Sequence, residues 1–82
     1  AIGNPSRLKI LLALWKSDKE LTVYKICQRT GLGRSAVSRH LLTLVETGLV
    51  SKKIYGEIPL YGIKKEDFRA LALIEFFAKT KV

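Results

Sequence analysis

Two arginines and two serines lie close together near the middle of the chain, in the segment 34–47. Arg34, Ser35, Ser38 and Arg39 are spaced so that one face of a helix would carry all four side chains. An arginine can give a bidentate contact to guanine or hold a phosphate, and a serine can bond to either group. These residue types in this spacing predict a nucleic-acid-binding surface, and they leave base and phosphate contacts undecided.

The residues around this segment predict a helix-turn-helix over residues 22–47. Thr22 is a good cap for the short first helix of this motif, and Gly31 can adopt the left-handed backbone that ends that helix. Gly33 then precedes a second helix that ends at Gly48. In this motif the second helix enters the DNA major groove and presents its N-terminal residues to base edges.

Further candidate contacts lie beside this helix. Thr22, Tyr24 and Lys25 open the first helix of the motif, where backbone N–H groups attract anions. His40 lies between the inner and outer sides of the second helix, so it can be a structural histidine or a DNA contact. Cys27 falls on an apolar stripe and is expected to pack in the core. Because no second Cys or His completes a ligand set, we predict no metal and no cofactor.

After Gly48 the apolar period changes from helical to alternating. Residues 49–63 are therefore predicted to form a hairpin, or wing, around a short loop at Gly56-Glu57. Lys52 and Lys53 can reach the phosphates that flank the groove, or can simply keep the surface soluble. Tyr55 can add a hydroxyl contact to DNA or pack across the hairpin.

The first helix is expected to begin at Asn4-Pro5 and to end near Lys16, since Asn is a cap and Pro suits the first turn. Its apolar residues form two groups. The stripe at i, i+3, i+4 and i+7 is predicted to face the core, and the other two form a second apolar edge. The stripe comprises Leu8, Leu11, Leu12 and Trp15, and the edge comprises Ile10 and Leu14.

The last predicted helix, over residues 65–79, is apolar on nearly every side. A chain of this size can cover only one side of such a helix, and soluble monomers rarely expose a large apolar patch. We therefore expect a second copy of the chain to cover the rest, which makes a homodimer. The expected interface residues are Leu73, Ile74 and Phe77, joined by Ile10 and Leu14 of the first helix.

Composition and charge restrict the class of protein. The 82 residues fit one α+β, mainly α, domain over residues 1–82, and the formal net charge of +8 favours a polyanionic partner. A single cysteine excludes an intrachain disulfide and is typical of a reducing compartment. Neither a leader nor an apolar run of membrane-spanning length is visible, so we expect a cytoplasmic protein without a membrane partner.

Catalytic patterns are absent from the sequence. The acidic residues are scattered, and there is no P-loop, no dinucleotide-binding glycine turn and no Ser-His-Asp set with a pocket to hold it. We therefore predict that the protein is not an enzyme.

The segments NPSRLKILLAL and TGLGRSAVSRHLLTLVETGLVSKK resemble the ArsR-like winged-helix transcriptional regulators. This resemblance implies a homodimer, formed by the first and last helices, that binds a roughly palindromic operator and usually represses. It places Ser35, Ser38, Arg39 and His40 at recognition-helix positions. Many members sense metals through paired cysteines or through a last helix with His and acidic ligands. Here only Cys27 and Glu75 are available, so we expect no metal sensing.

The sequence thus predicts a homodimeric, sequence-specific regulator of transcription that binds double-stranded DNA, acts as a repressor and associates with the nucleoid. Its effector is unknown. The chain is poor in thermally labile residues and resembles compact members from thermophilic archaea and their viruses and plasmids. Two alternatives stay open. One is a winged helix that contacts other proteins, and the other is an architectural protein that coats DNA without sequence preference.

Overall fold

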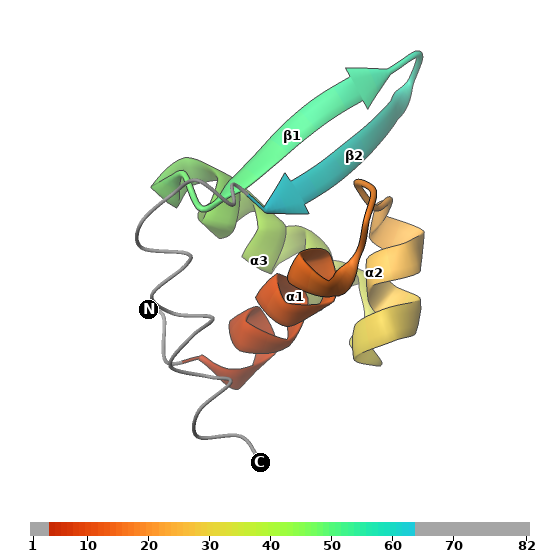
Figure 1. The fold of residues 1–82 in the computed structure, drawn as a ribbon. Coiled ribbons are helices and arrows are strands. Elements are labelled where there is room, and N and C mark those ends of the chain that lie inside the picture. The colour runs from red at the N-terminus through yellow and green to blue at the C-terminus, as the bar shows by residue number, and fades with distance from the viewer. Residues whose placement is uncertain (1–3, 64–82) are drawn as a thin grey trace.

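The computed structural model describes residues 4–63, and in them three helices are followed by two antiparallel strands (Figure 1). The helices gather into one body, and the hairpin of strands extends beyond it. This is the α+β winged helix-turn-helix arrangement that the sequence predicts. The predicted last helix over residues 65–79, with Leu73, Ile74 and Phe77, lies outside the described residues. The elements are α1 (Pro5–Lys16), α2 (Val23–Thr30), α3 (Arg34–Thr47), β1 (Val50–Tyr55) and β2 (Ile58–Ile63).

Helix α1 begins where the sequence predicts. The Asn4 side chain accepts hydrogen bonds from the backbone N–H groups of Ser6 and Arg7, at 2.8 and 3.3 Å. Pro5 occupies the first turn, where its missing N–H removes no intrahelical hydrogen bond. This cap satisfies amide groups that would otherwise lack a partner.

The side of α1 that faces the core differs from the prediction. Apolar side chains surround most of this helix, and contacts with α2, α3 and β2 select the inner side. The helix is turned by one residue, or about 100°, from the predicted orientation. Its buried residues are Ile10, Leu11 and Leu14, whereas Leu8, Leu12 and Trp15 are only partly buried.

This orientation of α1 also determines where two predicted interface residues lie. Ile10 and Leu14 are 0% and 3% exposed and belong to the core cluster of a single chain. They leave no free apolar surface for a second copy. The prediction that they contribute to a dimer interface is therefore wrong.

The turn between α2 and α3 is fixed by local interactions. Thr22 caps α2 by accepting a hydrogen bond from the backbone N–H of Lys25 at 3.1 Å. Gly31 ends the helix with φ of 79°, and its N–H donates to the carbonyl of Cys27 at 2.8 Å. Leu32 then packs against the core. The turn thereby sets the direction in which α3 leaves α2.

The core lies between the three helices and the base of the hairpin. Within residues 4–63 no polar or charged side chain is buried, so packing there is entirely apolar except for the Tyr61 hydroxyl. Helix α3 contributes one face, and that face fixes which of its side chains point outward. The buried cluster comprises Ile10, Leu11, Leu14, Leu21, Ile26, Val37, Leu41, Leu44, Leu49, Val50 and Tyr61.

The hairpin register leaves Gly56-Glu57 as a two-residue loop, because Tyr55 pairs with Ile58. Gly56 has φ of 62°, whereas no described non-glycine residue has a positive φ. A left-handed first loop residue followed by an ordinary one is the pattern of a type II′ turn. This turn matches the twist of the strands and confirms the predicted loop.

The outer edge of β2 alternates between two kinds of backbone position. Antiparallel pairing makes Tyr55 and Ile58 a hydrogen-bonded pair, so the next pair, Ile54 and Pro59, is not hydrogen-bonded. The missing N–H of Pro59 therefore costs no bond to β1. Two residues later, the backbone N–H and C=O groups of Tyr61 also point away from β1. They form two hydrogen bonds with the backbone of Leu21, both at 2.8 Å. This isolated bridge joins the α1–α2 connector to the outer edge of β2.

Candidate nucleic-acid interface

The outer face of α3 carries the four side chains singled out in the sequence. Arg34, Ser35, Ser38 and Arg39 are all exposed, and together with Leu42 they line one shallow hollow. The inner face of the same helix is held in the core, so this outward orientation is fixed by packing. The structure therefore brings the four residues together on one accessible surface.

The N-terminal end of α3 differs from those of the other two helices. Gly33 precedes α3 and makes no side-chain hydrogen bond to its first turn, whereas Asn4 and Thr22 cap α1 and α2. The first-turn N–H groups of α3 consequently have no capping side chain in front of them. Such groups carry partial positive charge and suit an anion such as a DNA phosphate.

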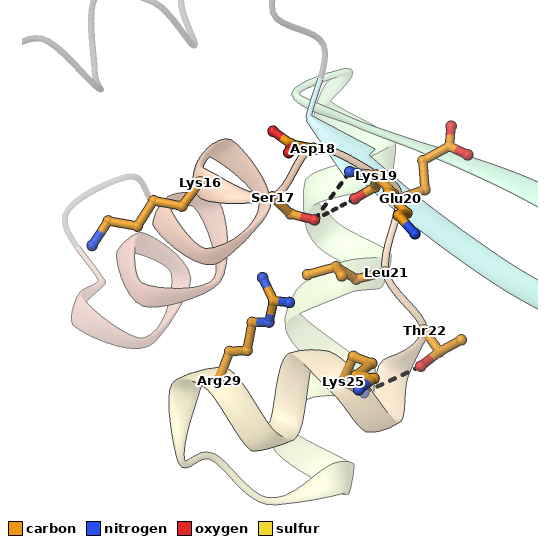
Figure 2. A pocket seen from close by; sticks show the side chains of 9 residues that line it. All are labelled: Lys16, Ser17, Asp18, Lys19, Glu20, Leu21, Thr22, Lys25 and Arg29. Atoms are coloured by element: carbon orange, nitrogen blue, oxygen red, sulfur yellow. Dashed lines mark hydrogen bonds between the residues drawn. The ribbon is translucent and has the colours of Figure 1, made fainter.

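The start of α2 places three further candidates on the surface. Tyr24 and Lys25 are exposed, and the hydroxyl of Tyr24 accepts a hydrogen bond from Gln28 at 3.1 Å. Thr22 is partly exposed, and Figure 2 shows its hydroxyl bonded to the Lys25 backbone. The same view shows the Arg29 side chain rising from α2 toward the end of α1. Thr22, Lys25 and Arg29 line a pocket of mixed charge between α2 and the α1–α2 connector.

The two lysines of the wing lie on opposite faces of the hairpin. Lys52 pairs with Tyr61, whose side chain packs in the core, so Lys52 lies on the face that meets the helices. Lys53 lies on the other face, where its Nζ is 3.2 Å from a carboxylate oxygen of Glu20. Hydrogen bonding and charge attraction from Glu20 raise the pKa of Lys53. Lys52 is thus the better-placed candidate for a phosphate.

The tip of the wing is unusually apolar for an exposed surface. Tyr55 is 61% exposed and lies opposite Ile58, so packing across the hairpin leaves most of its ring accessible. Ile54 and Ile58 are also more than half exposed. Glu57 lies in the loop between them and would be repelled by phosphates.

The His40 side chain contacts α1 and does not lie with the exposed side chains on the outer face of α3. Its Nδ1 accepts a hydrogen bond from Nε of Arg7 at 3.2 Å, and its side chain is only partly exposed. Burial of the ring, followed by the charges of Arg7 and Arg39, lowers the pKa of His40. Of the two alternatives that the sequence leaves open, the structure favours the structural histidine, and DNA contact by this residue stays a prediction.

One exposed residue of the hollow was not among the predicted contacts. Leu42 is 62% exposed and follows Ser38 by four residues and Arg39 by three. The helical spacing places it beside them, because residues three and four apart share a face. The sequence predicts Leu42 on this outer side of the helix, but without a role in binding.

Charge on the described part of the motif and wing is strongly biased. Every Lys and Arg between Thr22 and Ile63 is exposed, and the only acids in that range are Glu46 and Glu57. Such a surface attracts polyanions over a distance of about one Debye length, or ~8 Å in physiological salt.

The described residues lack a metal site and a membrane span. Among residues 4–63 no group of three or more His, Cys, Asp or Glu side chains could hold a metal ion. Cys27 is a free thiol that packs against the core, as the sequence predicts. No helix in the described part of the chain is long and apolar enough to cross a bilayer.

A helix-turn-helix whose outward helix is cationic, followed by a hairpin, defines the chain as a winged helix-turn-helix protein. Residues 4–52 match the model of the arsR family of bacterial regulatory proteins. The chain belongs to this family. It is a family of regulatory proteins and not of enzymes, in agreement with the prediction from the sequence.

Two curated relatives support this assignment. Over 71 residues, or 87% of the chain, it is 34% identical to the transcriptional activator HlyU of Vibrio cholerae. It is 32% identical over the same length to the transcriptional regulator YgaV of Escherichia coli. The chain spans 64% of the length of HlyU and 71% of that of YgaV.

Solved structures show the same fold. Reduced HlyU from Vibrio cholerae matches 98% of this chain and 80% of its own with a TM-score of 0.78 and 31% identity. A homodimeric winged helix-turn-helix DNA-binding domain from Mycobacterium bovis, described as a possible ArsR-family regulator, matches with a TM-score of 0.77 and 33% identity. That match covers 95% of this chain and 71% of the other.

Proposed function

We propose that this protein is a sequence-specific regulator of transcription that binds double-stranded DNA. The observation that carries the proposal is the outer face of α3, where Arg34, Ser35, Ser38 and Arg39 are exposed side by side. The side chains that pack the fold and those that can reach a ligand are segregated on opposite faces of this helix. Family membership supports a regulatory role.

In the proposed complex α3 lies in the major groove. The groove is about 12 Å wide and admits an α-helix, and arginine and serine match the donors and acceptors of base edges. Lys52, with Lys25 at the start of α2, would hold adjacent phosphates and fix the position of α3. Specificity then comes from the α3 stripe, and much of the affinity comes from the cations around it.

We further propose that two copies bind together, on a roughly palindromic site. The related domain from Mycobacterium bovis is homodimeric, and a two-fold dimer would contact half-sites about 34 Å apart. Leu73, Ile74 and Phe77 remain the proposed contacts between copies. Sedimentation equilibrium of the full chain tests this proposal, and a monomer at micromolar concentration would contradict it.

We propose repression as the direction of regulation. Repression by occupancy needs only tight binding over a promoter, which the α3 surface can supply. Activation needs a second contact with the transcription machinery, and the related HlyU is named an activator. Transcription in vitro from a promoter that carries the bound sequence separates the two outcomes. We also propose a cytoplasmic, nucleoid-associated location. We further propose a compact type from archaea or their viruses and plasmids, on the basis of composition and of the resemblance to such members, whereas the relatives above are bacterial.

Selection of bound sequences from random duplexes tests the central proposal. A specific regulator should enrich one motif and should prefer it by about 10³-fold or more over competitor DNA. An architectural protein would bind tightly without enrichment, and a protein-interaction module would bind DNA weakly and without preference. Either result would overturn the proposal of sequence-specific regulation.

A further inference from the structure

We infer that Leu42 is a specificity-determining residue that contacts the C5-methyl group of a thymine in the major groove. This inference rests on the proposed function and names one base group that the α3 surface would recognise. Leu42 lines the hollow but is not among the DNA contacts predicted from the sequence.

Leu42 belongs to the same surface as the polar candidates. It is 62% exposed and lines the hollow together with Arg34, Ser35, Ser38 and Arg39. It is the apolar member of a stripe that is otherwise cationic or hydroxylated. One turn later the stripe reaches Glu46, an exposed carboxylate that phosphates would repel. Leu42 is therefore the last residue of this stripe that suits a DNA surface.

The major groove offers one apolar group on its base edges, the C5-methyl of thymine. Exposed in the free protein, the Leu42 side chain keeps apolar surface in water. Contact with a thymine methyl removes apolar surface from water on both partners, which is favourable. Any other base would place a polar edge or no group against this side chain.

A protein partner is a weaker candidate for covering Leu42. Whatever covers this residue also meets the guanidinium groups of Arg34 and Arg39, which line the same hollow. A DNA duplex supplies phosphates and guanine edges for the arginines and a methyl group for the leucine. Charge complementarity thus favours DNA as the occupant of the whole hollow.

The helix geometry places the expected thymine. Leu42 follows Ser35 by seven residues, and an α-helix rises about 1.5 Å per residue, so the two lie about 10 Å apart along α3. Base pairs are about 3.4 Å apart, so this separation equals about three base-pair steps. The thymine contacted by Leu42 should therefore lie about three base pairs from the base nearest Ser35.

The test replaces thymine by deoxyuridine, which differs by the single methyl group. The duplex selected from random sequences is the probe, and each thymine of a half-site is replaced in turn. The full chain should bind one of these duplexes about three- to fivefold more weakly, the value expected for one buried methyl group. Leu42→Ala should bind the parent duplex more weakly by a similar factor and should no longer distinguish thymine from deoxyuridine at that position.

Ile58→Ala is the matched control, because it removes a similarly exposed apolar side chain from the wing. It should keep the full effect of deoxyuridine. Specific binding by the wild-type chain with no methyl effect at any thymine, or with an equal effect in Leu42→Ala, overturns the inference and leaves the proposed function intact. Absence of sequence-specific binding by the wild-type chain overturns both the inference and the proposed function. Equal thermal stability of Leu42→Ala and wild type confirms that the variant is folded.

Discussion

Arg7 on α1 donates a hydrogen bond from Nε to Nδ1 of His40 on α3, at 3.2 Å. The two residues are 33 positions apart, so the bond joins the first helix to the helix that carries the exposed stripe. Because Nδ1 is the acceptor, the ring is neutral and carries its proton on Nε2. Protonation of the imidazole would remove this acceptor and place a third positive charge beside Arg7 and Arg39.

The fold should therefore lose stability in mild acid. Burial of the ring and the charges of Arg7 and Arg39 lower the pKa of His40 from its ordinary value of 6.5. Between the two pKa values the unfolded chain binds the proton and the folded chain does not. The stabilisation is therefore present above pH 6.5 and is lost as the pH falls from there through the lowered value.

Thermal unfolding between about pH 7.5 and pH 5 measures this effect. His40→Gln is the control, since its amide does not titrate and can still bond to Arg7. Its melting temperature should fall less than that of the wild type over the same range. An equal fall in both proteins would show that other groups control the pH dependence.

The features that the sequence predicted correctly depend on neighbours in the chain. Asn4 and Thr22 cap their helices because a side-chain oxygen can reach an N–H two or three residues away. Gly31 and Gly56 take the positive φ angles that their turns need. The exposed stripe of α3 was predictable for a similar reason, because a polar face opposite an apolar face needs only helical spacing.

The features that were missed depend on contacts between distant parts of the chain. Helix α1 has apolar residues on two sides, so its pattern fits two orientations, and packing with α2, α3 and β2 decides between them. The pairing of Lys53 with Glu20 arises because Leu21 docks on Tyr61 and brings the α1–α2 connector to the wing. Neither relationship leaves a signal in the local sequence.

Gly31→Ala should destabilise the protein by about 1–2 kcal/mol. Gly31 has φ of 79°, and a Cβ added there meets no atom of the surrounding fold within 4 Å, so the cost comes from the backbone conformation of this residue and not from a clash with other parts of the protein. Urea unfolding followed by circular dichroism measures the change in the free energy of unfolding.

Gly33→Ser provides the contrast for that experiment. Gly33 has φ of −73° and precedes α3 without a capping side chain, so a serine there can accept a hydrogen bond from the first turn. It should stabilise the fold by roughly a few tenths of a kcal/mol, because glycine is itself a tolerated residue at this position. Stabilities that change in the same direction in both variants would contradict this account of the turn.

Lys52→Ala should weaken the salt dependence of DNA binding more than Lys53→Ala. Each phosphate contact contributes about 0.9 to the slope of log K against log salt concentration. Lys52 is exposed on the face of the wing that meets the helices, whereas Lys53 is paired with Glu20 on the other face. We expect the slope to fall by about 0.9 for Lys52→Ala and by less for Lys53→Ala, measured by fluorescence anisotropy at several salt concentrations.

The Glu20 carboxylate supplies an independent check on the wing. Glu20→Gln removes the charge that holds Lys53 and should increase DNA affinity at low salt, because the freed ammonium can then reach a phosphate. Lys53 is exposed and Glu20 is partly exposed, so loss of the pair should change stability little. If Lys53→Ala alone lowered the slope of log K against log salt concentration by about 0.9, the ion pair with Glu20 would not restrain Lys53.

Arg39→Ala should cost about 1–3 kcal/mol of affinity for the selected DNA site and should relax specificity at one base pair. Arg39 is exposed in the middle of the α3 stripe, beside Ser38 and one turn from Leu42. Arg29→Ala is the matched control, because it removes the same charge from α2, outside the hollow. That control should lower affinity for specific and random duplexes by the same small factor. If Arg39→Ala behaved like Arg29→Ala, with a uniform loss across sequences, Arg39 would hold a phosphate and the base-reading role would pass to Arg34 and the serines.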